Sequence, residues 1–423
     1  MTITESTPTG PNPEGQDQYA TETTFASLGV CAPLVEALDR QGIVKAFPIQ
    51  ALTVRDALAG RDVCGKAKTG SGKTLGFGVP LIQRTWESLG GAKGELRQIE
   101  GGPARPRALV LLPTRELCVQ VAEVLSPLAE DLGMRCVAVY GGADIERQIK
   151  QLRKGCEVII ATPGRLIDLG DRGELSVEQL ETLVLDEADR MADMGFMPQV
   201  EWVLRRLTEE HQTLLFSATL DGAVDRLVKR YLTDPVFHEV ASSTQTVSLM
   251  VHRFLAIHQR DKTKVAAAIA KANSKTLMFM RTKRAADRLV EDLLDEGIKA
   301  AAIHGDLRQS NRERALADFA SDKLPVLVAT DVAARGLHIE GVDAVIHFDP
   351  PEDHKAYLHR SGRTARAGTE GVVVSLLLHN QLVEAEVIQR RIGIKVPMVE
   401  MFSNDPRLAD LAAWEPQASE GVL

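Results

Sequence analysis

The sequence is poor in aromatic residues and cysteines and contains no long hydrophobic run, and each shortage argues against a class of protein. Aromatic residues make up 4% of the 423 residues, so stacking platforms for nucleic-acid bases are scarce. The five cysteines include no CxxC pair, which argues against zinc and a disulfide framework. No apolar run approaches the roughly 20 residues that a membrane helix needs. The first 24 residues contain no Lys or Arg, so we expect no targeting peptide, no membrane partner and a cytoplasmic protein.

The formal charge of -8 lies at the two ends of the chain. Residues 1–24 carry -4 and residues 400–423 carry another -4, so residues 25–399 are formally neutral. A negative net charge argues against nucleic-acid binding by the molecule as a whole, but it does not report the charge of a single cleft. We predict that residues 1–24 form a disordered acidic tail and that 401–423 form an acidic tail whose last dozen residues are loose.

The remaining chain reads as two similar α/β domains. Short apolar runs rich in β-branched residues alternate with helical patterns, which is typical of parallel sheets covered on both faces. The predicted strands are Ala108–Leu112, Cys136–Tyr140, Val158–Ala161, Leu183–Leu185, Thr213–Phe216, Phe254–Ile257, Thr276–Met280, Val326–Ala329, Ala344–Phe348 and Val372–Leu377. Residues 241–249 carry no charge and no clear period, and we predict a linker there between domains at 25–240 and 250–400.

Polar or glycine-containing clusters directly follow several of these strands. Ligands bind beyond the carboxyl ends of the strands in open parallel sheets, so the clusters should line one edge of each sheet, and two such edges facing across a hinge would make a cleft. The basic, glycine-rich segment Gly90–Arg107 interrupts the first domain. It is either a plain surface loop or a nucleic-acid contact.

Ala67–Thr74 (AKTGSGKT) lies between a strand ending near Gly65 and a helix starting near Gly72. Its glycines would let backbone N–H groups surround phosphate oxygens at the helix N-terminus. Lys73 would reach the β and γ phosphates, and the Thr74 hydroxyl would bind Mg²⁺. The strict P-loop pattern has Gly where this chain has Ala67, and a simple glycine turn is the alternative.

An acidic pair supplies the second half of a nucleotide site. Three apolar strand residues bring Asp186 and Glu187 to the sheet edge, where Asp186 can hold the Mg²⁺ shell and Glu187 can orient and deprotonate water. Acidic pairs at helix starts are common, and the P-loop upstream is what makes this pair significant.

Three arginines, Arg360, Arg363 and Arg366, recur at spacings of three, and we expect no acidic partner nearby to neutralise them. A solvated basic helix face is the ordinary explanation of such a run. The alternative is the capture of an anion, with guanidinium groups acting as arginine fingers on a γ-phosphate bound by the other domain.

In these motifs and their order, residues 24–400 resemble a DEAD-box ATP-dependent RNA helicase of superfamily 2. The resemblance implies an α/β fold of two tandem RecA-like parallel-sheet domains joined by a short linker. It also implies ATP and Mg²⁺ as cofactors, with Thr74 and Asp186 at the metal. Residues 23–51 match the Q motif, in which Phe25 would stack on adenine and Gln50 would read its edge.

The resemblance assigns roles to further positions. Lys73, Asp186, Glu187, Arg363 and Arg366 would act on the phosphates, while Ser217 and Thr219 of the Ser-Ala-Thr motif would couple hydrolysis to strand separation. The full set of implied nucleotide contacts is Phe25, Phe47, Gln50, Ala67, Lys68, Thr69, Gly70, Ser71, Gly72, Lys73, Thr74, Asp331, Gly336, Arg363 and Arg366.

The implied RNA contacts are glycines, threonines and arginines, which suit phosphate and sugar oxygens and carry no sequence information. They are Pro113, Thr114, Arg115, Gly141, Gly142, Thr162, Pro163, Gly164, Arg165, Arg281, Thr282, Gly305, Gln309, Arg312 and Thr330. Taken singly, several of these positions, such as Gly141 and Gly142, would read as simple turns.

Two positions depart from the family pattern. His338 stands where the family usually has Asp near the ATP ribose or the domain interface, and Ala365 stands where it usually has Gly. A His at 338 could make activity depend on pH.

We therefore expect an RNA-stimulated ATPase that acts as a monomer and separates short RNA duplexes without processivity or remodels RNA–protein complexes. Protein partners would be ribonucleoprotein or RNA-decay components. An ATP-gated RNA clamp with little unwinding is the alternative that the same motifs allow. A DNA helicase is disfavoured by the Q motif and by DEAD in place of DExH.

Overall fold

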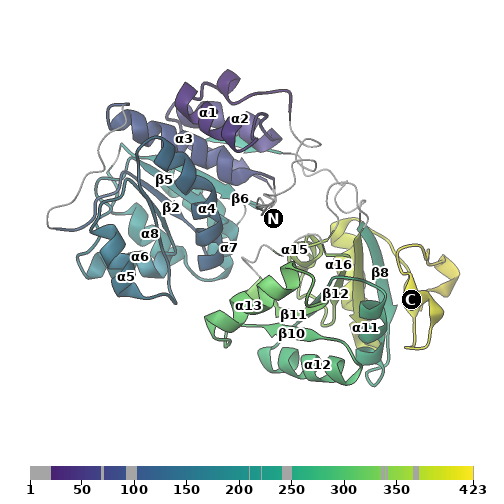
Figure 1. Cartoon of the computed structure of the whole chain (residues 1–423). Helices are drawn as coiled ribbons and strands as arrows, with labels where there is room; N and C mark the ends of the chain where they lie inside the picture. The colour runs from purple at the N-terminus through teal and green to yellow at the C-terminus, as the bar shows by residue number, and fades with distance from the viewer. Residues whose placement is uncertain are drawn as a thin grey trace, which may run out of the picture. The chain divides into compact units, whose positions relative to one another are not determined.

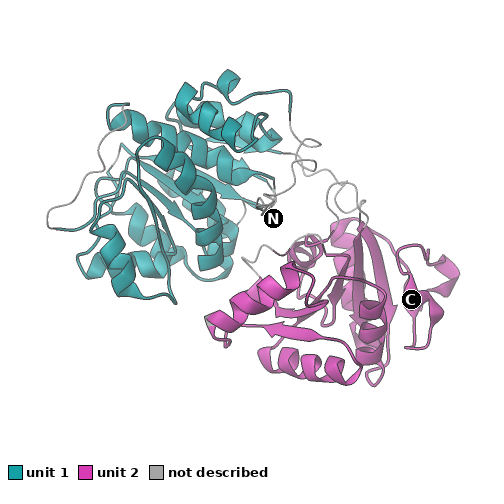
Figure 2. Ribbon diagram, in the orientation of Figure 1, with its two compact units in different colours: residues 1–242 teal, residues 243–423 magenta. Residues whose placement is uncertain are grey.

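A computed structural model describes residues 21–67, 71–91, 102–208, 210–220, 222–240, 250–334, 339, 342–364 and 371–422. Most of the expected N-terminal tail, the expected linker and the centre of the Gly90–Arg107 segment lie outside the described residues. The chain divides into two compact units, residues 1–242 and 243–423 (Figure 2).

Unit 1 is built around a seven-stranded parallel sheet with the strand order β3-β4-β2-β5-β6-β1-β7. Figure 1 labels three of its strands, β2, β5 and β6, among the surrounding helices. Its strands are β1 (Val63–Lys66), β2 (Ala108–Leu111), β3 (Cys136–Val139), β4 (Val158–Ala161), β5 (Thr182–Asp186), β6 (Gln212–Ser217) and β7 (Val236–Glu239). Its helices are η2 (Ala26–Leu28), α1 (Ala32–Arg40), α2 (Pro48–Leu58), α3 (Lys73–Ser88), α4 (Arg115–Asp131), α5 (Ile145–Leu152), α6 (Pro163–Asp171), α7 (Ala188–Asp193), α8 (Met197–Leu204) and α9 (Gly222–Tyr231).

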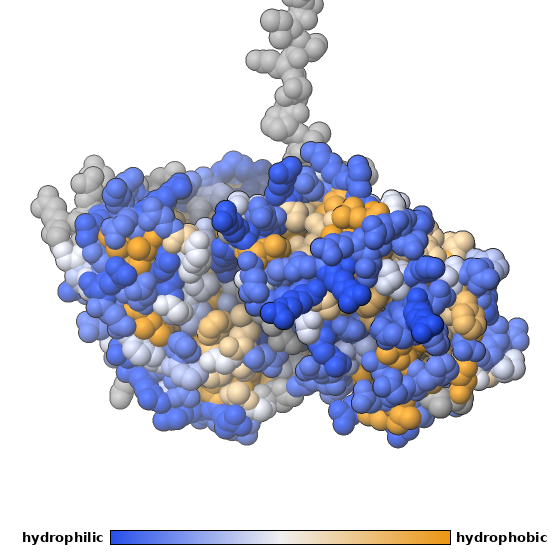
Figure 3. All heavy atoms as spheres, turned by 90° about the horizontal axis from the view of Figure 1, so that it is seen from below, coloured by the Kyte–Doolittle hydropathy of each residue, from blue (hydrophilic) through white to orange (hydrophobic). Residues whose placement is uncertain are grey.

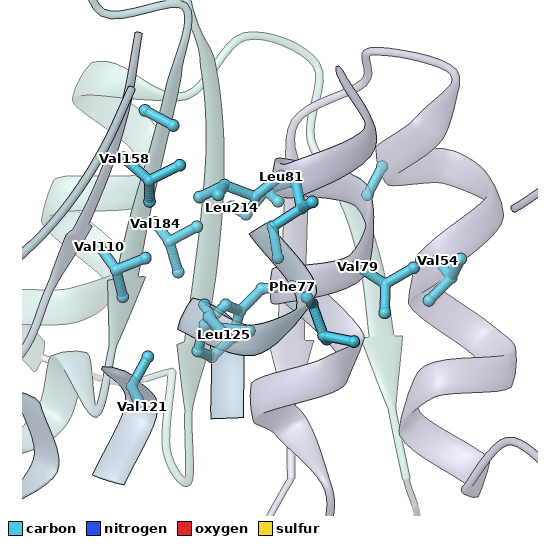
Figure 4. Close-up of a cluster of buried hydrophobic side chains, with 14 of the residues drawn as sticks. Val54, Phe77, Val79, Leu81, Val110, Val121, Leu125, Val158, Val184 and Leu214 are labelled. Carbon is cyan, nitrogen blue, oxygen red and sulfur yellow. The ribbon is translucent and has the colours of Figure 1, made fainter. Parts of the chain in front are cut away.

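The apolar strands of unit 1 are continuous because both faces of the sheet are buried. In β4, Val158 and Ile160 pack into the core under α1 to α4, whereas Ile159 and Ala161 pack into the core under α5 to α9. Figure 4 shows the first of these cores, where Phe77 and Leu81 of α3 and Leu125 of α4 meet the sheet. At roughly 1.5–3 kcal/mol for each large apolar side chain, this burial holds the helices on the sheet and fixes the strand ends that carry the polar clusters.

Unit 2 repeats this architecture with a seven-stranded parallel sheet in the order β10-β11-β9-β12-β13-β8-β14. Its strands are β8 (Met250–Ala256), β9 (Thr276–Met280), β10 (Ala300–Ile303), β11 (Val326–Thr330), β12 (Ala344–His347), β13 (Gly371–Leu377) and β14 (Met398–Glu400). Its helices are α11 (Lys262–Lys271), α12 (Lys283–Asp295), α13 (Gln309–Ala320), α14 (Asp331–Ala334), α15 (His354–Ser361), η3 (His379–Gln381), α16 (Leu382–Ile392), η4 (Pro406–Ala409) and η5 (Ala418–Glu420). The predicted class of two parallel-sheet α/β units is confirmed.

The C-terminal segment differs from the expected loose tail. Leu408 and Leu411 are buried in the unit 2 core. The guanidinium of Arg253, on β8, donates hydrogen bonds to backbone carbonyls of this segment, those of Leu411, Ala412 and Trp414. Near the end of the chain, Val422 N–H donates to Met398 O at 2.9 Å, beside the edge strand β14. The expectation of a loose end was wrong because acidic composition does not report apolar residues spaced to reach a neighbouring core.

No helix among the described residues is long and apolar enough to cross a bilayer. On the face that Figure 3 draws, hydrophilic residues predominate and hydrophobic residues form separate patches. Described large apolar side chains that are exposed include Val44, Phe237, Leu294, Val383 and Phe402.

Candidate active site

The carboxyl edge of the unit 1 sheet carries two groups of motifs side by side. The P-loop follows β1, Asp186 is the last residue of β5 and Ser217 is the last residue of β6. These three strands are neighbours in the order β5-β6-β1. The other half of the edge, β3-β4-β2, leads into the segments predicted to contact RNA. The strand order therefore separates the two groups that the sequence distributes along the chain.

The described part of the P-loop enters α3 through a glycine in the left-handed conformation. Gly72 is the N-cap of α3 and has a φ of 82°, in the left-handed region that favours glycine. A Cβ at Gly72 would lie 2.5 Å from Gln50 Nε2, so a larger residue would displace that side chain. Ala67 N–H donates to Ser217 O at 3.1 Å, which fixes the start of the loop beside β6. Lys68, Thr69 and Gly70 lie outside the described residues.

A buried cluster of charges lies beneath the P-loop. Lys73, the first residue of α3, is 5% exposed, and its Nζ lies 3.3 Å from Glu187 Oε1 and 3.9 Å from Asp186 Oδ1. Burial would lower the pKa of Lys73, but the carboxylates of Glu187, Asp186 and Asp189 outweigh it and raise this pKa. Lys73 is therefore a permanently charged group held at the sheet edge.

Arg190 completes this cluster and was missed from the sequence. It is 4% exposed, and its Nη1 lies 3.4 Å from Glu187 Oε2. The signal that could have revealed it is the Glu-x-x-Arg spacing, which brings Arg190 in the first turn of α7 back toward Glu187, the N-cap of that helix. Glu187 itself has a left-handed φ of 55°, a conformation that costs a non-glycine residue free energy and is typical of functional sites.

The chemistry of the cluster fits a magnesium ion. Among the described residues, three buried carboxylates, those of Asp186, Glu187 and Asp189, lie in one cluster with the cations Lys73 and Arg190. Burial raises the pKa of Asp186 to about 6, against the opposing charge of Lys73. A divalent cation would stabilise the ionised Asp186. Among the described residues no group of three or more His, Cys, Asp or Glu side chains is arranged to hold a metal ion. Mg²⁺ commonly takes only one or two carboxylates, with substrate phosphates as further ligands.

Asp189 joins the acidic motif to the Ser-Ala-Thr motif. Its Oδ2 accepts hydrogen bonds from Thr219 N–H at 3.2 Å and from Thr219 Oγ1 at 3.5 Å. Its own N–H donates to Ser217 Oγ at 3.2 Å. Asp189 is 8% exposed and Ser217 is fully buried, so these bonds are shielded from water. A displacement of Asp186 and Glu187 would therefore be transmitted through Asp189 to Ser217 and Thr219.

Gln50, in the segment predicted to read adenine, is oriented by two hydrogen bonds. Its Oε1 accepts from Phe47 N–H at 2.8 Å, and its Nε2 donates to Gly72 O at 2.8 Å. A side-chain amide has two N–H donors and an oxygen with two lone pairs, so one donor and one acceptor remain beyond these bonds. That pair complements the N7 acceptor and N6 donor of adenine.

Phe25 and Phe47 differ in their access to a ligand. Phe25 is 1% exposed and belongs to the hydrophobic core of unit 1, so its ring face is not available for stacking in this structure. Phe47 is only partly buried, and its Cβ and ring would contact a Cβ placed at Gly72. Of the two predicted aromatic contacts, Phe47 is the one that lies against the P-loop.

The predicted RNA contacts of unit 1 form a connected strip at the ends of β2, β3 and β4. Gly141 N–H donates to Thr162 Oγ1 at 3.4 Å, and a Cβ at Gly142 would lie 2.9 Å from Arg115 Nη1. Thr114 caps α4 by accepting from Leu117 N–H. Pro163 and Gly164 follow Thr162 in the first turn of α6. Arg165 does not project freely, because it donates to Gln148 Oε1 and Ala143 O.

Gln148 is 5% exposed and was not singled out from the sequence. Its Oε1 accepts a hydrogen bond from Arg165 Nη1 at 2.7 Å, and its Nε2 donates one to Tyr140 O at 3.1 Å. Because it lies on α5 with its partners on two other segments, only the tertiary structure reveals it as a support for this strip.

Unit 2 places its predicted RNA contacts in the equivalent half of its sheet, after β10, β11 and β9. Arg281 and Thr282 follow β9 and are exposed, and Thr282 caps α12. Gly305 follows β10 and is exposed, while Thr330 ends β11 and is buried. On α13, Arg312 donates to Ala333 O at 2.8 Å. Gln309 is the first residue of α13.

The arginine motif behaves differently from the sequence expectation. Arg360 is 3% exposed and forms a bidentate ion pair with Asp331, at 2.7 Å from Nε to Oδ1 and 2.6 Å from Nη2 to Oδ2. The expectation that no acidic partner lies nearby was wrong, since Asp331 is distant in sequence but ends up beside α15. Arg363 is 8% exposed and, with Arg360 and Asp331, lines a small pocket. Arg366, Gly336, His338 and Ala365 lie outside the described residues.

Comparisons with known proteins agree with this arrangement. The DEAD/DEAH box helicase family matches residues 47–227, and the helicase conserved C-terminal domain family matches residues 260–368. A solved structure of S. cerevisiae Dbp5 is similar with a TM-score of 0.75 and 27% identity, covering 90% of this chain and 96% of that one. A structure of Mss116p gives a TM-score of 0.76 at 25% identity, covering 92% and 81%.

Curated relatives are closer in sequence. The chain is 40% identical to the DEAD-box ATP-dependent RNA helicase CshA of Geobacillus kaustophilus over 370 residues, which is 87% of this chain and 76% of that protein. The corresponding protein of Bacillus subtilis is 40% identical over 358 residues, 84% of this chain and 69% of that one. The chain therefore belongs to the family of DEAD-box ATP-dependent RNA helicases, with two tandem RecA-like units and an ATP-hydrolysing activity.

Proposed function

We propose that this helicase uses ATP to separate short RNA duplexes without processivity or to remodel RNA–protein complexes. The observation that carries the proposal is the division of one sheet edge in unit 1. The ATP motifs occupy β5-β6-β1 and the candidate RNA strip occupies the adjoining β3-β4-β2. One rigid parallel sheet carries both groups of residues. A displacement of the ATP motifs can therefore be transmitted through the sheet to the RNA strip.

In the ATP site, Lys73 binds the β and γ phosphates, and Gln50 with Phe47 recognises adenine. Glu187 orients and deprotonates the attacking water, while Arg363 and Arg366 stabilise charge that develops on the γ-phosphate. Thr74 and Asp186 would hold Mg²⁺, which supplies charge neutralisation at the phosphates when bound. Asp189 transmits displacements of the acidic motif to Ser217 and Thr219 through its hydrogen bonds with both residues.

RNA is bound through its backbone, with weak affinity in the absence of ATP and strong affinity when ATP is present. The glycines, threonines and arginines of the two strips suit phosphate and sugar oxygens. Dbp5 was solved bound to RNA and ADP BeF3, and Mss116p bound to ssRNA and AMP-PNP, which supports RNA as the ligand of this chain. Asp331, which forms an ion pair with Arg360, stays a proposed contact of the nucleotide.

The test compares ATPase stimulation by RNA with stimulation by DNA of the same sequence, together with strand separation of short and long RNA duplexes. We expect stimulation by RNA alone and unwinding that falls steeply with duplex length. Equal stimulation by DNA, or unwinding that is independent of length, would contradict the proposal.

An ATP-gated RNA clamp is the second candidate, because the same motifs would serve both functions. A clamp would hold single-stranded RNA through many times the duration of one turnover and release little duplex. Measuring RNA dwell time and duplex release in one preparation separates the two candidates. We further propose a cytoplasmic monomer whose targets are chosen by ribonucleoprotein or RNA-decay partners.

A further inference from the structure

Asp349 lies where the candidate RNA strip of unit 2 meets the helix that carries the arginine motif. It follows β12, which is paired with β9 in the register Phe279↔His347. Its N–H donates to Phe279 O at 3.0 Å, and its Oδ2 accepts from Arg281 N–H at 2.8 Å. The Asp349 carboxylate therefore holds the first residue after β9, which together with Thr282 makes the exposed turn of the RNA strip.

The backbone of the same residue holds the arginine motif. Asp349 O accepts from Arg360 Nη1 at 2.6 Å. Arg360 is also fixed by Asp331 and lies 5.2 Å over the ring of Phe279. Arg363 is three residues further on, two residues past the end of α15, and its N–H donates to Arg360 O at 3.3 Å. The position of Arg360 thus sets where the end of this helix, and with it Arg363, is held.

The connection through Asp349 is stiff. Pro350 and Pro351 follow it, so the φ angles of both are restricted by their rings and Asp349 itself is confined to extended conformations. The Asp349 carboxylate also lies 3.9 Å, from Oδ1, from the Nζ of Lys262, which is 4% exposed. Because the backbone torsions at Asp349 and the two prolines are restricted, they cannot absorb a shift of the Arg281 turn. Such a shift therefore also moves the Asp349 carbonyl.

We propose that Asp349 is a positioning residue that couples RNA contact at the Arg281–Thr282 turn to the placement of Arg363. RNA bound at the turn would fix Asp349, and Asp349 would fix Arg360 and the end of α15. The inference rests on the proposed function, in which the turn contacts RNA and Arg363 acts on ATP. Because coupling between two sites is reciprocal, the same residue would make RNA affinity depend on nucleotide.

The chain supplies a matched control at the opposite end of the same two strands. Asp343, just before β12, accepts Lys275 N–H through Oδ2 at 2.9 Å, and Lys275 directly precedes β9. Asp343→Ala and Asp349→Ala thus each remove a carboxylate bond to a backbone N–H between β12 and β9. Only Asp349 adjoins the two motifs, so a purely structural role predicts the same behaviour for both variants.

The experiment measures RNA affinity of the full chain with and without AMP-PNP, and AMP-PNP affinity with and without RNA. We expect Asp349→Ala to reduce the effect of AMP-PNP on RNA affinity by about 10-fold, within the range of allosteric couplings. RNA affinity without nucleotide and AMP-PNP affinity without RNA should each change by less than about 2-fold, because Asp349 itself contacts neither ligand in the proposed function. In Asp343→Ala, AMP-PNP should change the RNA affinity by the same factor as in the unaltered chain.

Asp349→Asn tests the proposal even if the alanine variant folds poorly. Its side-chain oxygen can still accept Arg281 N–H, so it should retain most of the coupling. Coupling in Asp349→Ala equal to that of the unaltered chain would overturn the proposal, and so would an equal loss in Asp343→Ala. If the unaltered chain shows no effect of AMP-PNP on RNA affinity, the proposed function fails first and the inference falls with it.

Discussion

Replacing Arg360 with alanine should destabilise unit 2, whereas replacing Arg363 should chiefly slow ATP turnover. Arg360→Ala removes a bidentate ion pair with Asp331 and the bond to Asp349 O, at distances of 2.6–2.7 Å. Removing one member of a buried pair costs about 3–5 kcal/mol. The Asp331 side chain is 28% exposed and is partly solvated by water, which reduces the expected loss to about 2–4 kcal/mol.

Scanning calorimetry of the full chain is the appropriate assay. A loss of about 3 kcal/mol lowers the unfolding temperature of a unit of this size by about 6–12 °C. Arg363→Ala should lower it less and reduce RNA-stimulated turnover by about 10³-fold or more. Asp331→Ala and the double variant complete a cycle in which the second substitution costs less than it does alone. Equal unfolding temperatures of Arg360→Ala and Arg363→Ala, or an additive cycle, would show that the Arg360–Asp331 pair does not stabilise unit 2.

Three further predictions follow from single residues. Glu187→Gln should keep ATP and RNA binding but reduce turnover by about 10²-fold or more, and undiminished ATPase would show that Glu187 is not the base. Burial, with the charges of Arg360 and His252, lowers the pKa of fully buried His347, so the fold favours its neutral form. The unfolded chain takes up the proton below about pH 6.5, and unit 2 should lose up to about 1.4 kcal/mol per pH unit there. His347→Asn should flatten this dependence in denaturant unfolding at pH 5 to 7, and an unchanged slope would exclude His347 as its source. Leu408→Ala should cost unit 2 about 2–4 kcal/mol, since Leu408 is 2% exposed; no change in unfolding would mean that the C-terminal segment is loose.

Local patterns in the sequence were sufficient for the chemistry of single segments. Val158–Ala161 and Thr276–Met280 were predicted with the boundaries that the structure has, because continuous β-branched and apolar residues suit strands buried on both faces. The predicted start of the helix near Gly72 is also confirmed, since glycine followed by Lys and Thr marks the turn into α3.

The strands that were missed, β7, β10 and β14, are all edge strands. β7, β10 and β14 each lie at an end of a sheet, and β7 and β10 consist largely of partly exposed or exposed residues. Their stability comes from pairing with one neighbouring strand, so their sequences carry a weak signal of their own. In β10 the residues Ala300–Ile303 include three alanines, which favour a helix by local propensity.

The sequence alone determined which residue types stand after each strand, and with them the family and its chemistry. Only the tertiary structure decided which of these residues are neighbours. Strand order separates the ATP half of the sheet edge from the RNA half, and it brings Asp331 to Arg360 and Asp349 to Arg281 across long stretches of chain. The physical reason is that local propensity acts over a few residues. The contacts of a buried carboxylate with an arginine or a backbone N–H depend instead on which strands become neighbours when the sheet assembles.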